Sequence, residues 1–228
     1  MTVAGIVKSS LIDYPGLIAC VLFTPGCNYD CFYCQNRPLI NGSYTVLNLD
    51  DIRDFLKKRV GQLDAVVLTG GEPTLRPDLT DFLGELKHLG YKVKLDTNGS
   101  IPSVVEKVLQ SGLADYFAVD YKAPSNRYKE LCGNAADADK VLGTIRLLKD
   151  FGADFEVRTT VIPQLGEADL IKMTQELPLL PRFMLNRYRK PEVYLPRDAA
   201  KVSAPPYTQE QIQAFAETLR KWQPNVLS

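Results

Sequence analysis

The sequence predicts an α/β protein built as an open, partial (β/α)6 barrel of parallel strands. Short apolar runs alternate with helical patterns six times along the chain. The runs show little alternation of apolar and polar residues, which is typical of parallel strands that are covered on both faces. Six units are too few for a complete eightfold barrel. A flat, doubly wound sheet is the alternative, but the chain has no G-x-G-x-x-G motif that would support it.

The candidate strands share a high content of Val, Leu, Phe and Tyr and are bounded by turn residues. They are the runs 17–24, 64–69, 91–97, 116–121, 155–162 and 183–188. Apolar residues at helical spacing fill the gaps between them. The expected helices are 49–60 after the N-cap Asn48, 79–89 before Gly90, 103–109 after Pro102, 138–151 before Gly152, 169–177 before Pro178, and a last helix that a capping box at 208–211 opens and that runs to 222.

Composition favours one domain over 1–228. We divide it into an N-terminal lead-in (1–16), six βα units (17–190) and a C-terminal extension with a helix (191–228). The 228 residues are 45% apolar, which is enough for one substantial core. The net charge of zero argues against bulk binding to nucleic acid or to membranes. With no apolar run of spanning length, no secretory signal and only five cysteines, we expect a cytoplasmic protein.

Three cysteines carry most of the functional information. Cys27, Cys31 and Cys34 form a C-x3-C-x2-C pattern, called the cysteine motif below. Three thiolates can hold three corners of an iron–sulfur cluster and leave one iron open to another ligand, whereas clusters that only carry electrons usually have four cysteine ligands. A redox disulfide at Cys31 and Cys34, half of a zinc site, or a disulfide framework are weaker explanations. A third cysteine at the right offset argues against the redox disulfide. The lack of a second ligand pair argues against the zinc site, and the chain length argues against the disulfide framework.

The two other cysteines fit structural roles better. Cys20 lies in an apolar run and is expected in the core. Cys132 follows a short helical segment; it could be a fourth ligand, but a structural cysteine is the better interpretation. His88, the only histidine, lies off the apolar stripe of its helix and is expected to face solvent.

In parallel α/β folds, ligands bind at the carboxyl ends of the strands. The first strand leads into the cysteine motif. The second ends in Thr69-Gly-Gly-Glu-Pro73. Gly70 and Gly71 would allow a close backbone approach with exposed N–H and C=O groups, and Glu72 would add an acceptor for an ammonium group. A tight turn is the simpler explanation, but we expect it not to account for the glutamate.

The later strand ends are also polar. Asp96, Thr97 and Asn98 suit hydroxyl groups or a small cation, although an Asx turn would explain Asn98 alone. Asp120 and Lys122 point to one side of the fourth strand and could form a structural ion pair or act in catalysis.

The fifth and sixth strands add basic residues. Arg158 could hold a carboxylate or could simply be paired within the protein. The stretch 186–190 is expected to be a solvated rim first and a docking surface second.

The cysteine motif, together with Gly70-Gly-Glu-Pro73, resembles the radical S-adenosylmethionine (SAM) enzymes. The agreement spans most of the chain. The N-terminal segment 8–16 is similar to the lead-in of activating enzymes for glycyl radical proteins, above all those that activate anaerobic ribonucleoside-triphosphate reductase. Segments 95–99 and 120–122 also resemble parts of pyruvate formate-lyase activating enzymes.

The resemblance implies a [4Fe–4S] cluster on the cysteine motif, with SAM chelating the open iron. Gly70, Gly71 and Glu72 would bind the amine of SAM, and Tyr33 and Val161 would lie near the adenine.

The remaining SAM contacts are implied in the same way. Asp96 and Asn98 would hold the ribose or, with Thr97, a monovalent cation. Arg158 would face the SAM carboxylate. The family's pyruvate formate-lyase branch uses a histidine late in the chain near the nucleoside, and this sequence has none after His88.

The implied activity is reductive cleavage of SAM to a 5′-deoxyadenosyl radical, which removes a hydrogen atom from a glycine of a partner enzyme. Asp120 and Lys122 would be catalytic residues near SAM and the incoming glycine. The expected partners are a glycyl radical protein, such as the large subunit of anaerobic ribonucleotide reductase, and an electron donor such as flavodoxin or ferredoxin. The alternatives are a radical SAM enzyme acting on a small molecule, for example a deazapurine-forming one, and a non-catalytic zinc-binding module.

Overall fold

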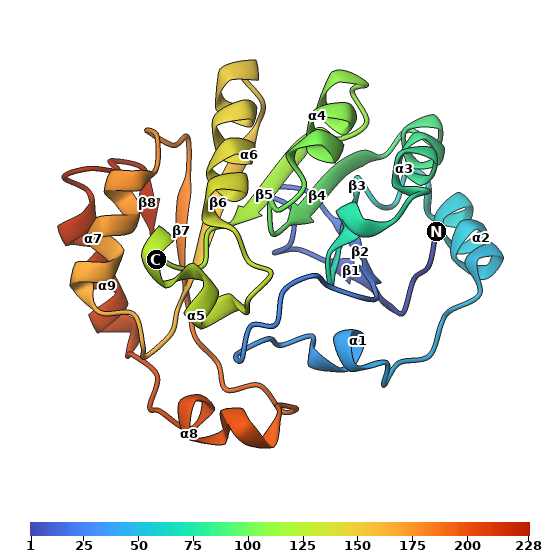
Figure 1. Cartoon of the computed structure of the whole chain (residues 1–228). Helices are drawn as coiled ribbons and strands as arrows, with labels where there is room; N and C mark the ends of the chain where they lie inside the picture. The colour runs from blue at the N-terminus through green and yellow to red at the C-terminus, as the bar shows by residue number, and fades with distance from the viewer. The chain divides into compact units, whose positions relative to one another are not determined.

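The computed structural model describes all residues from Met1 to Ser228 and shows an α/β chain (Figure 1). All six expected strands are present, with two further strands at the ends of the chain. The strands are β1 (Gly5–Ser10), β2 (Ala19–Thr24), β3 (Ala65–Gly70), β4 (Lys92–Thr97), β5 (Tyr116–Asp120), β6 (Phe155–Val161), β7 (Phe183–Arg187) and β8 (Val226–Leu227).

All six expected helices are present as well, and so is the short helical segment that we expected at Cys132. Two further short helices were not anticipated because segments of four or five residues carry no periodic pattern. The helices are α1 (Arg37–Asn41), α2 (Leu49–Arg59), α3 (Leu79–His88), α4 (Pro102–Gln110), α5 (Tyr128–Cys132), α6 (Ala138–Phe151), α7 (Glu167–Glu176), α8 (Ala199–Val202) and α9 (Gln209–Leu219). Short 3₁₀ turns cover Pro73–Leu75, Ser125–Arg127 and Pro196–Asp198. None of the helices combines the length and the apolar character that crossing a lipid bilayer requires.

The expected helix ends are explained by their caps. The Asn48 side chain accepts hydrogen bonds from the first amides of α2, and Thr208 and Gln211 form the capping box of α9. Helix α7 begins two residues earlier than expected. The Asp169 carboxylate accepts a hydrogen bond from the Gly166 amide, which extends the first turn backward.

The chain divides into two compact units. The first consists of residues 1–27, 38–97 and 103–118, and the second of residues 28–37, 98–102 and 119–228. The single domain that we expect from composition remains a prediction.

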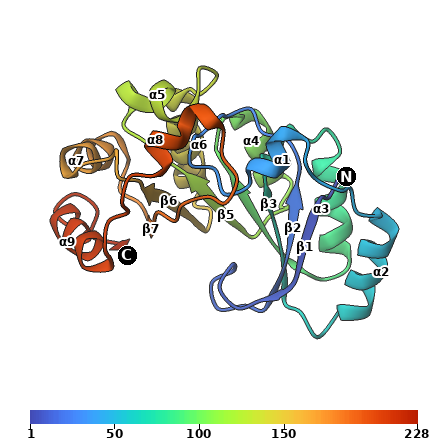
Figure 2. The ribbon, with the colours of Figure 1, turned by 90° about the horizontal axis from the view of Figure 1, so that it is seen from below.

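In the first unit the strand order is β1-β2-β3-β4, followed by the first residues of β5. The pairs β2–β3 and β3–β4 are parallel, as predicted, whereas β1 is antiparallel to β2. Helices α2 and α3 lie beside these strands in both views (Figures 1 and 2). Both faces of β2 are buried, since neighbouring Val21 and Leu22 are each at most 1% exposed. This two-sided burial explains why the strand lacks an alternating pattern.

The β1 strand lies inside the segment that we treated as a lead-in. Its middle residues are exposed, so it has no apolar pattern by which the sequence could reveal it. The connection from β1 to β2 lies in the lower part of Figure 2. It contains Leu11 and Ile12, which are 74% and 91% exposed. Its backbone is nevertheless fixed, because the buried Lys94 ammonium donates a 2.6 Å hydrogen bond to the Asp13 carbonyl.

In the second unit the last residues of β5 are followed by β6, β7 and β8. The pairs β6–β7 and β7–β8 are parallel. Helices α7 and α9 lie side by side in both views (Figures 1 and 2). Strand β8 has two residues, which is too short for any sequence pattern to predict.

Candidate functional site

The strand end at Gly70 and Gly71 is built around contacts between backbones. The Gly71 amide donates to the Thr24 carbonyl and the Glu72 amide to the Gly26 carbonyl, each over 2.8 Å. A Cβ on Gly71 would lie 1.9 Å from the Gly26 carbonyl oxygen, and Gly70 has a φ of +116°. The expected close approach is therefore present, but it is made to the entry of the cysteine motif. The Gly71 N–H, which we expected to be exposed, is already bonded.

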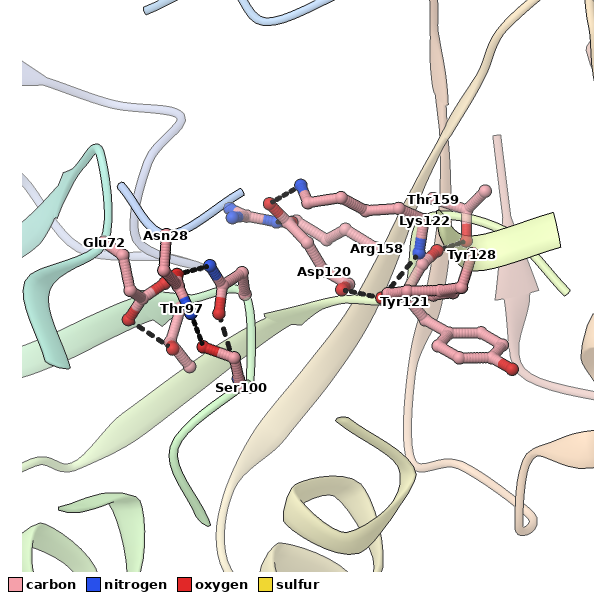
Figure 3. A network of polar contacts seen from close by, with 11 residues as sticks. Asn28, Glu72, Thr97, Ser100, Asp120, Tyr121, Lys122, Tyr128, Arg158 and Thr159 are labelled. Atoms are coloured by element: carbon pink, nitrogen blue, oxygen red, sulfur yellow. Dashed lines mark hydrogen bonds and ion pairs between the residues drawn. The ribbon is translucent and has the colours of Figure 1, made fainter. Parts of the chain in front are cut away.

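Glu72 has a structural role that our sequence analysis set aside. The side chain is fully buried, and its Oε1 accepts hydrogen bonds from the Thr74 amide (3.0 Å), the Thr74 hydroxyl (2.6 Å) and the Thr97 hydroxyl (2.6 Å; Figure 3). It caps the 3₁₀ turn Pro73–Leu75 and ties it to the end of β4. The turn thus does account for the glutamate, contrary to our expectation, because it needs a side-chain acceptor. The role of Glu72 toward the SAM amine stays a prediction.

The end of β4 holds Asp96 next to a cation of the protein itself. The Asp96 carboxylate lies 3.4 Å from the ammonium of Lys94, and both side chains are almost fully buried. The Lys94 ammonium also lies over the ring of Tyr116, 5.8 Å from its centroid. A lysine therefore supplies positive charge beside the position where we predict the ribose or a monovalent cation.

Asn98 connects the end of β4 with the cysteine motif. Its Nδ2 donates to Asn28 Oδ1 over 2.9 Å, and its Oδ1 accepts from the Ser100 amide over 2.9 Å. Asn28 in turn donates to the Ser100 hydroxyl over 2.8 Å (Figure 3). The Asx turn that we considered for Asn98 exists, and the same side chain also fixes the residue that follows Cys27.

A buried arginine holds the middle of the motif. Arg37 is 1% exposed and donates from Nη2 to the Cys31 carbonyl and from Nη1 to the Asp30 carboxylate, each over 2.5 Å. Asp30 also accepts from Arg197, and its amide donates to the Cys132 carbonyl over 2.8 Å. Sequence reasoning missed these supports, because a basic residue just after the motif gives no local sign that it will be buried.

None of the three cysteines of the motif forms a disulfide bond. Cys31 is buried, and a hydrogen bond with the Cys132 thiol, followed by burial, raises its pKa well above the usual range. Burial and the neighbouring Cys31 likewise raise the pKa of Cys34. Binding of iron must displace these protons, so it releases acid and is favoured at higher pH.

The donor set suits an iron–sulfur cluster. Three cysteines, none of them in a disulfide, lie in one short loop whose entry is fixed by the two glycines. No group of three or more His, Cys, Asp and Glu side chains converges on the position of a single metal ion. A [4Fe–4S] cluster does not require such convergence, since each cysteine binds a different iron, whereas the ligands of a zinc ion share one centre.

Asp120, Lys122 and Arg158 form a three-residue ion cluster. Asp120 accepts from Lys122 Nζ over 2.9 Å and from Arg158 Nε over 3.0 Å (Figure 3). Burial acts to raise the pKa of Asp120, but the two cations outweigh it and hold the pKa at about 2. For Lys122, burial acts to lower the pKa, and Asp120, followed by Cys31, raises it well above the usual range. The ion pair that we left open is therefore present, and Arg158 is paired as well.

The remaining predicted residues are placed as follows. Tyr33 is buried against Phe32, with the two rings edge to face at 5.1 Å, and Val161 is buried at the end of β6. His88 is exposed, as expected.

Cys20 is buried in β2, as expected, and burial raises its pKa to about 12. In the stretch 186–190, every residue except Tyr188 is exposed, which agrees with a solvated rim. The rim borders a cavity of about 590 Å³ that Asn186, Arg187, Tyr188, Arg189, Pro206 and Gln209 line.

Residues 21–177 match the family model of the radical SAM superfamily. The chain belongs to this superfamily. Members of the radical SAM superfamily are enzymes that use a [4Fe–4S] cluster and SAM, and the three cysteines that follow the end of β2 agree with that chemistry.

Similar proteins include two from Methanocaldococcus jannaschii that carry the provisional name glycyl-radical enzyme activating enzyme. The first, MJ1227, is 31% identical over 99% of this chain and 94% of its own length. The second, MJ1632, is 30% identical over 66% of this chain and 59% of its own length. A protein of Saccharolobus solfataricus, provisionally named GTP 3′,8-cyclase, is 35% identical over 58% of this chain and 43% of its own length.

Solved structures of this superfamily share the fold. SuiB of Streptococcus suis, bound to SAM, aligns with a TM-score of 0.67 at 18% identity over 89% of this chain and 48% of SuiB. A domain of pyruvate-formate lyase-activating enzyme from Bacteroides vulgatus aligns with a TM-score of 0.54 at 19% identity over 69% of this chain and 94% of that domain. These alignments confirm the predicted partial-barrel α/β fold.

Proposed function

We propose that this radical SAM enzyme is an activase that removes a hydrogen atom from a glycine of a partner enzyme. The observation that carries the proposal is the similarity to MJ1227, because it extends over 99% of this chain and 94% of that protein. The partner that we propose is the large subunit of anaerobic ribonucleoside-triphosphate reductase, on the basis of the lead-in segment 8–16.

In this proposal Cys27, Cys31 and Cys34 hold the cluster, which supplies the electron that cleaves SAM. The role of the surrounding protein is to hold the loop of the cysteine motif in one conformation. Arg37 and Asn98 fix the loop residues Cys31 and Asn28 by hydrogen bonds that need no metal. A loop fixed in advance loses less entropy when the cluster assembles.

The carbonyl groups of Gly70 and Gly71 and the Glu72 carboxylate would bind the SAM amine. An ammonium group needs acceptors, so the bonded N–H of Gly71 is no obstacle. Asp120 accepts a hydrogen bond from Arg158 Nε and would thereby orient the guanidinium before the SAM carboxylate binds. Lys122 and Asp120 would face the incoming glycine.

The test is anaerobic reconstitution with iron and sulfide, followed by reduction with dithionite in the presence of SAM and the reductase large subunit. We expect a glycyl radical doublet in the electron paramagnetic resonance (EPR) spectrum of the large subunit and one 5′-deoxyadenosine per radical. Cys31→Ala should give neither. The reductase would be the wrong partner if its spectrum stayed silent while another glycyl radical protein from the same cell gave the doublet.

A second candidate is a radical SAM enzyme that acts on a small molecule. The proteins provisionally named GTP 3′,8-cyclase favour it, since one is 35% identical over 58% of this chain. Under this alternative, the loaded enzyme would convert a metabolite such as a purine nucleotide with no second protein present. Incubation of the reconstituted enzyme with GTP alone, analysed by mass spectrometry, separates the two candidates.

A further inference from the structure

The inference concerns the cavity of about 590 Å³ at the carboxyl end of β7, called the arginine pocket below. Its walls come from two segments of the second unit: residues 186–189 at the end of β7, and residues 206 and 209 where the chain enters α9. Strand β7 and helix α9 are in contact (Figure 1). The volume lies in the range of about 300–1,000 Å³ that is typical of pockets for small molecules.

The walls of the arginine pocket carry positive charge. Arg187 and Arg189 line it, and none of the other lining residues is acidic. Neither guanidinium forms an ion pair, whereas Arg127, Arg182 and Arg220 of the same unit all do. Both arginines are also exposed, so a ligand can reach them from solvent. The pocket thus offers two cations that no carboxylate of the protein neutralises by direct contact.

One hydrogen bond within the protein fixes Arg187. Its Nε donates to the Tyr207 carbonyl over 2.9 Å. This bond uses only the Nε–H donor, so both terminal NH2 groups remain available to a ligand. A guanidinium that is held in this way loses less entropy when it binds an anion through two parallel hydrogen bonds.

The acidic residue that opposes this charge is Glu210, in the first turn of α9. The charge of Arg187 acts on its carboxylate, but Glu210 is exposed and does not line the pocket. One negative charge stands against the two arginines and the exposed Lys190 that follows them. The region of the pocket therefore keeps a net positive charge.

The arginine pocket lies beside the cysteine motif. Gln35, which follows Cys34, donates from Nε2 to the Arg189 carbonyl over 2.5 Å. The register of β6 and β7 pairs Arg187 with Val161, the residue that we predict to lie near the adenine of SAM. A ligand in the pocket would therefore bind one strand beyond the predicted position of the adenine.

We propose that the arginine pocket binds a small molecule through a diphosphate or triphosphate group, which Arg187 and Arg189 hold. Two guanidinium groups in one pocket match a group with several anionic oxygens, whereas one carboxylate would satisfy only one of them. The site goes beyond the proposed function. It contains none of the residues that we assign to the cluster or to SAM, so binding requires neither the partner enzyme nor cleavage of SAM.

The experiment is calorimetric titration of the anaerobically reconstituted enzyme, with SAM at saturation, using pyrophosphate and tripolyphosphate. These probes contain no nucleoside, so they do not report on the adenosine part of the SAM site. The variants are Arg187→Gln and Arg189→Gln. Arg146→Gln is the matched control, because Arg146 in α6 is also exposed and without an ion pair but does not line the pocket. Extraction of iron by the probes would be the same in all variants, so differences between them report on the pocket.

We expect one saturable site in the wild type, with tripolyphosphate bound more tightly than pyrophosphate and with an affinity that falls as salt is added. Arg187→Gln and Arg189→Gln should each weaken binding by roughly tenfold, and Arg146→Gln should leave it unchanged. Arg189→Gln removes no side-chain hydrogen bond of the protein, so it remains decisive if loss of the bond to Tyr207 disturbs the other variant. Glu210→Gln should bind both probes more tightly than the wild type.

Three results would overturn the proposal. The first is the absence of saturable binding, and the second is equal binding by the wild type and both arginine variants. Either would show that the stretch 186–190 is a solvated rim and no more. The third is citrate that binds as tightly as tripolyphosphate and depends equally on both arginines, because that would identify a site for carboxylates. None of these results bears on the glycyl radical assay, so failure of this proposal and failure of the proposed function are distinguishable.

Discussion

At the scale of single residues, Gly71 is the glycine with the least room for a side chain. A methyl group there would collide with the Gly26 carbonyl, so Gly71→Ala must break the hydrogen bonds that join β3 to the entry of the cysteine motif. We expect a loss of about 3 kcal/mol in the free energy of unfolding, and a lower iron content after reconstitution. Urea denaturation and iron analysis measure the two effects.

Gly143→Ala is the control for this substitution. Gly143 lies in α6, and a Cβ there meets nothing within 4 Å. This variant should be more stable than the wild type by about 0.5–1 kcal/mol, because alanine has the higher helix propensity. Equal stability of the two glycine variants would contradict the close approach at Gly71.

The low pKa of Asp120 predicts how the stability of the protein depends on pH. Its pKa in the folded protein is about 2, below the unfolded value of 3.8, so its ion pairs stabilise the fold above pH 4 and lose this effect as pH falls toward 2. Asp120→Asn should cost on the order of 1–2 kcal/mol near neutral pH, and the cost should shrink between pH 4 and pH 2. Urea denaturation of the metal-free proteins across this range measures the difference.

Asp139→Asn serves as the comparison for Asp120→Asn, since Asp139 is exposed in the first turn of α6. Its cost should be a few tenths of a kcal/mol at most. A cost of Asp120→Asn that stayed constant down to pH 2 would mean that Lys122 and Arg158 do not depress the pKa of Asp120.

At the scale of elements, the start of α1 is as important for the cysteine motif as the strand that precedes it. Arg37, the first residue of α1, makes two contacts with the motif through separate nitrogens of one planar group. Lysine has a single nitrogen and cannot reproduce both. We expect Arg37→Lys to load less cluster and to lose it faster in air, as followed by the decay of the visible absorption of the cluster.

Arg53→Lys is the matched variant for Arg37→Lys. Arg53 in α2 also makes two hydrogen bonds to Glu85, each over 2.8 Å, and a third to Asp50 over 3.2 Å, but its side chain is 36% exposed. An exposed pair contributes little, so Arg53→Lys should leave cluster loading unchanged. The same loss in both variants would mean that the contacts of Arg37 do not support the motif.

The sequence predicted the long elements and the short helix that ends at Cys132, but it missed β1, β8, α1 and α8 for a physical reason. Strands β2 to β7 are short apolar runs, and the six longer helices bury apolar residues at helical spacing; a single sequence reveals both patterns. Strand β1 is exposed in its middle, helix α1 has five residues, and the end of α5 is held by a partner far along the chain. That partner is the Asp30 amide, which donates to the Cys132 carbonyl, and nothing near either residue indicates the other.

The candidate site also has features that the sequence predicts and features that it does not. Donor chemistry at the strand ends, such as the cysteine motif and Asp120, is visible in the residue types. The hydrogen bonds that these groups make within the folded protein cannot be predicted from the residue types. We expected the Glu72 carboxylate to be available to a ligand. Its Oε1 instead accepts three hydrogen bonds from the protein.

At the scale of the whole molecule, the cluster should act as a stabilising ligand. Anything that binds the folded chain more tightly than the unfolded chain raises the free energy of unfolding. Removal of iron with a chelator under anaerobic conditions should lower the melting temperature by several degrees, since 1 kcal/mol corresponds to about 2–4 °C in a chain of this size. Anaerobic differential scanning fluorimetry measures the shift.

The control for iron removal is Cys31→Ala, which lacks one ligand. Its melting temperature should respond little to the chelator. A response as large as that of the wild type would show that the chelator acts elsewhere on the protein.

The backbone bonds from Gly71 and Glu72 to the carbonyls of Thr24 and Gly26 have a consequence for amide hydrogen exchange. They exist without any metal, so these two amides should exchange slowly in the iron-free protein. The cost of ordering the loop, roughly 1–2 kcal/mol for each residue, then falls only on the residues beyond Gly26 that are not yet tied. Assembly of the cluster begins from a loop whose first residues already have their final conformation.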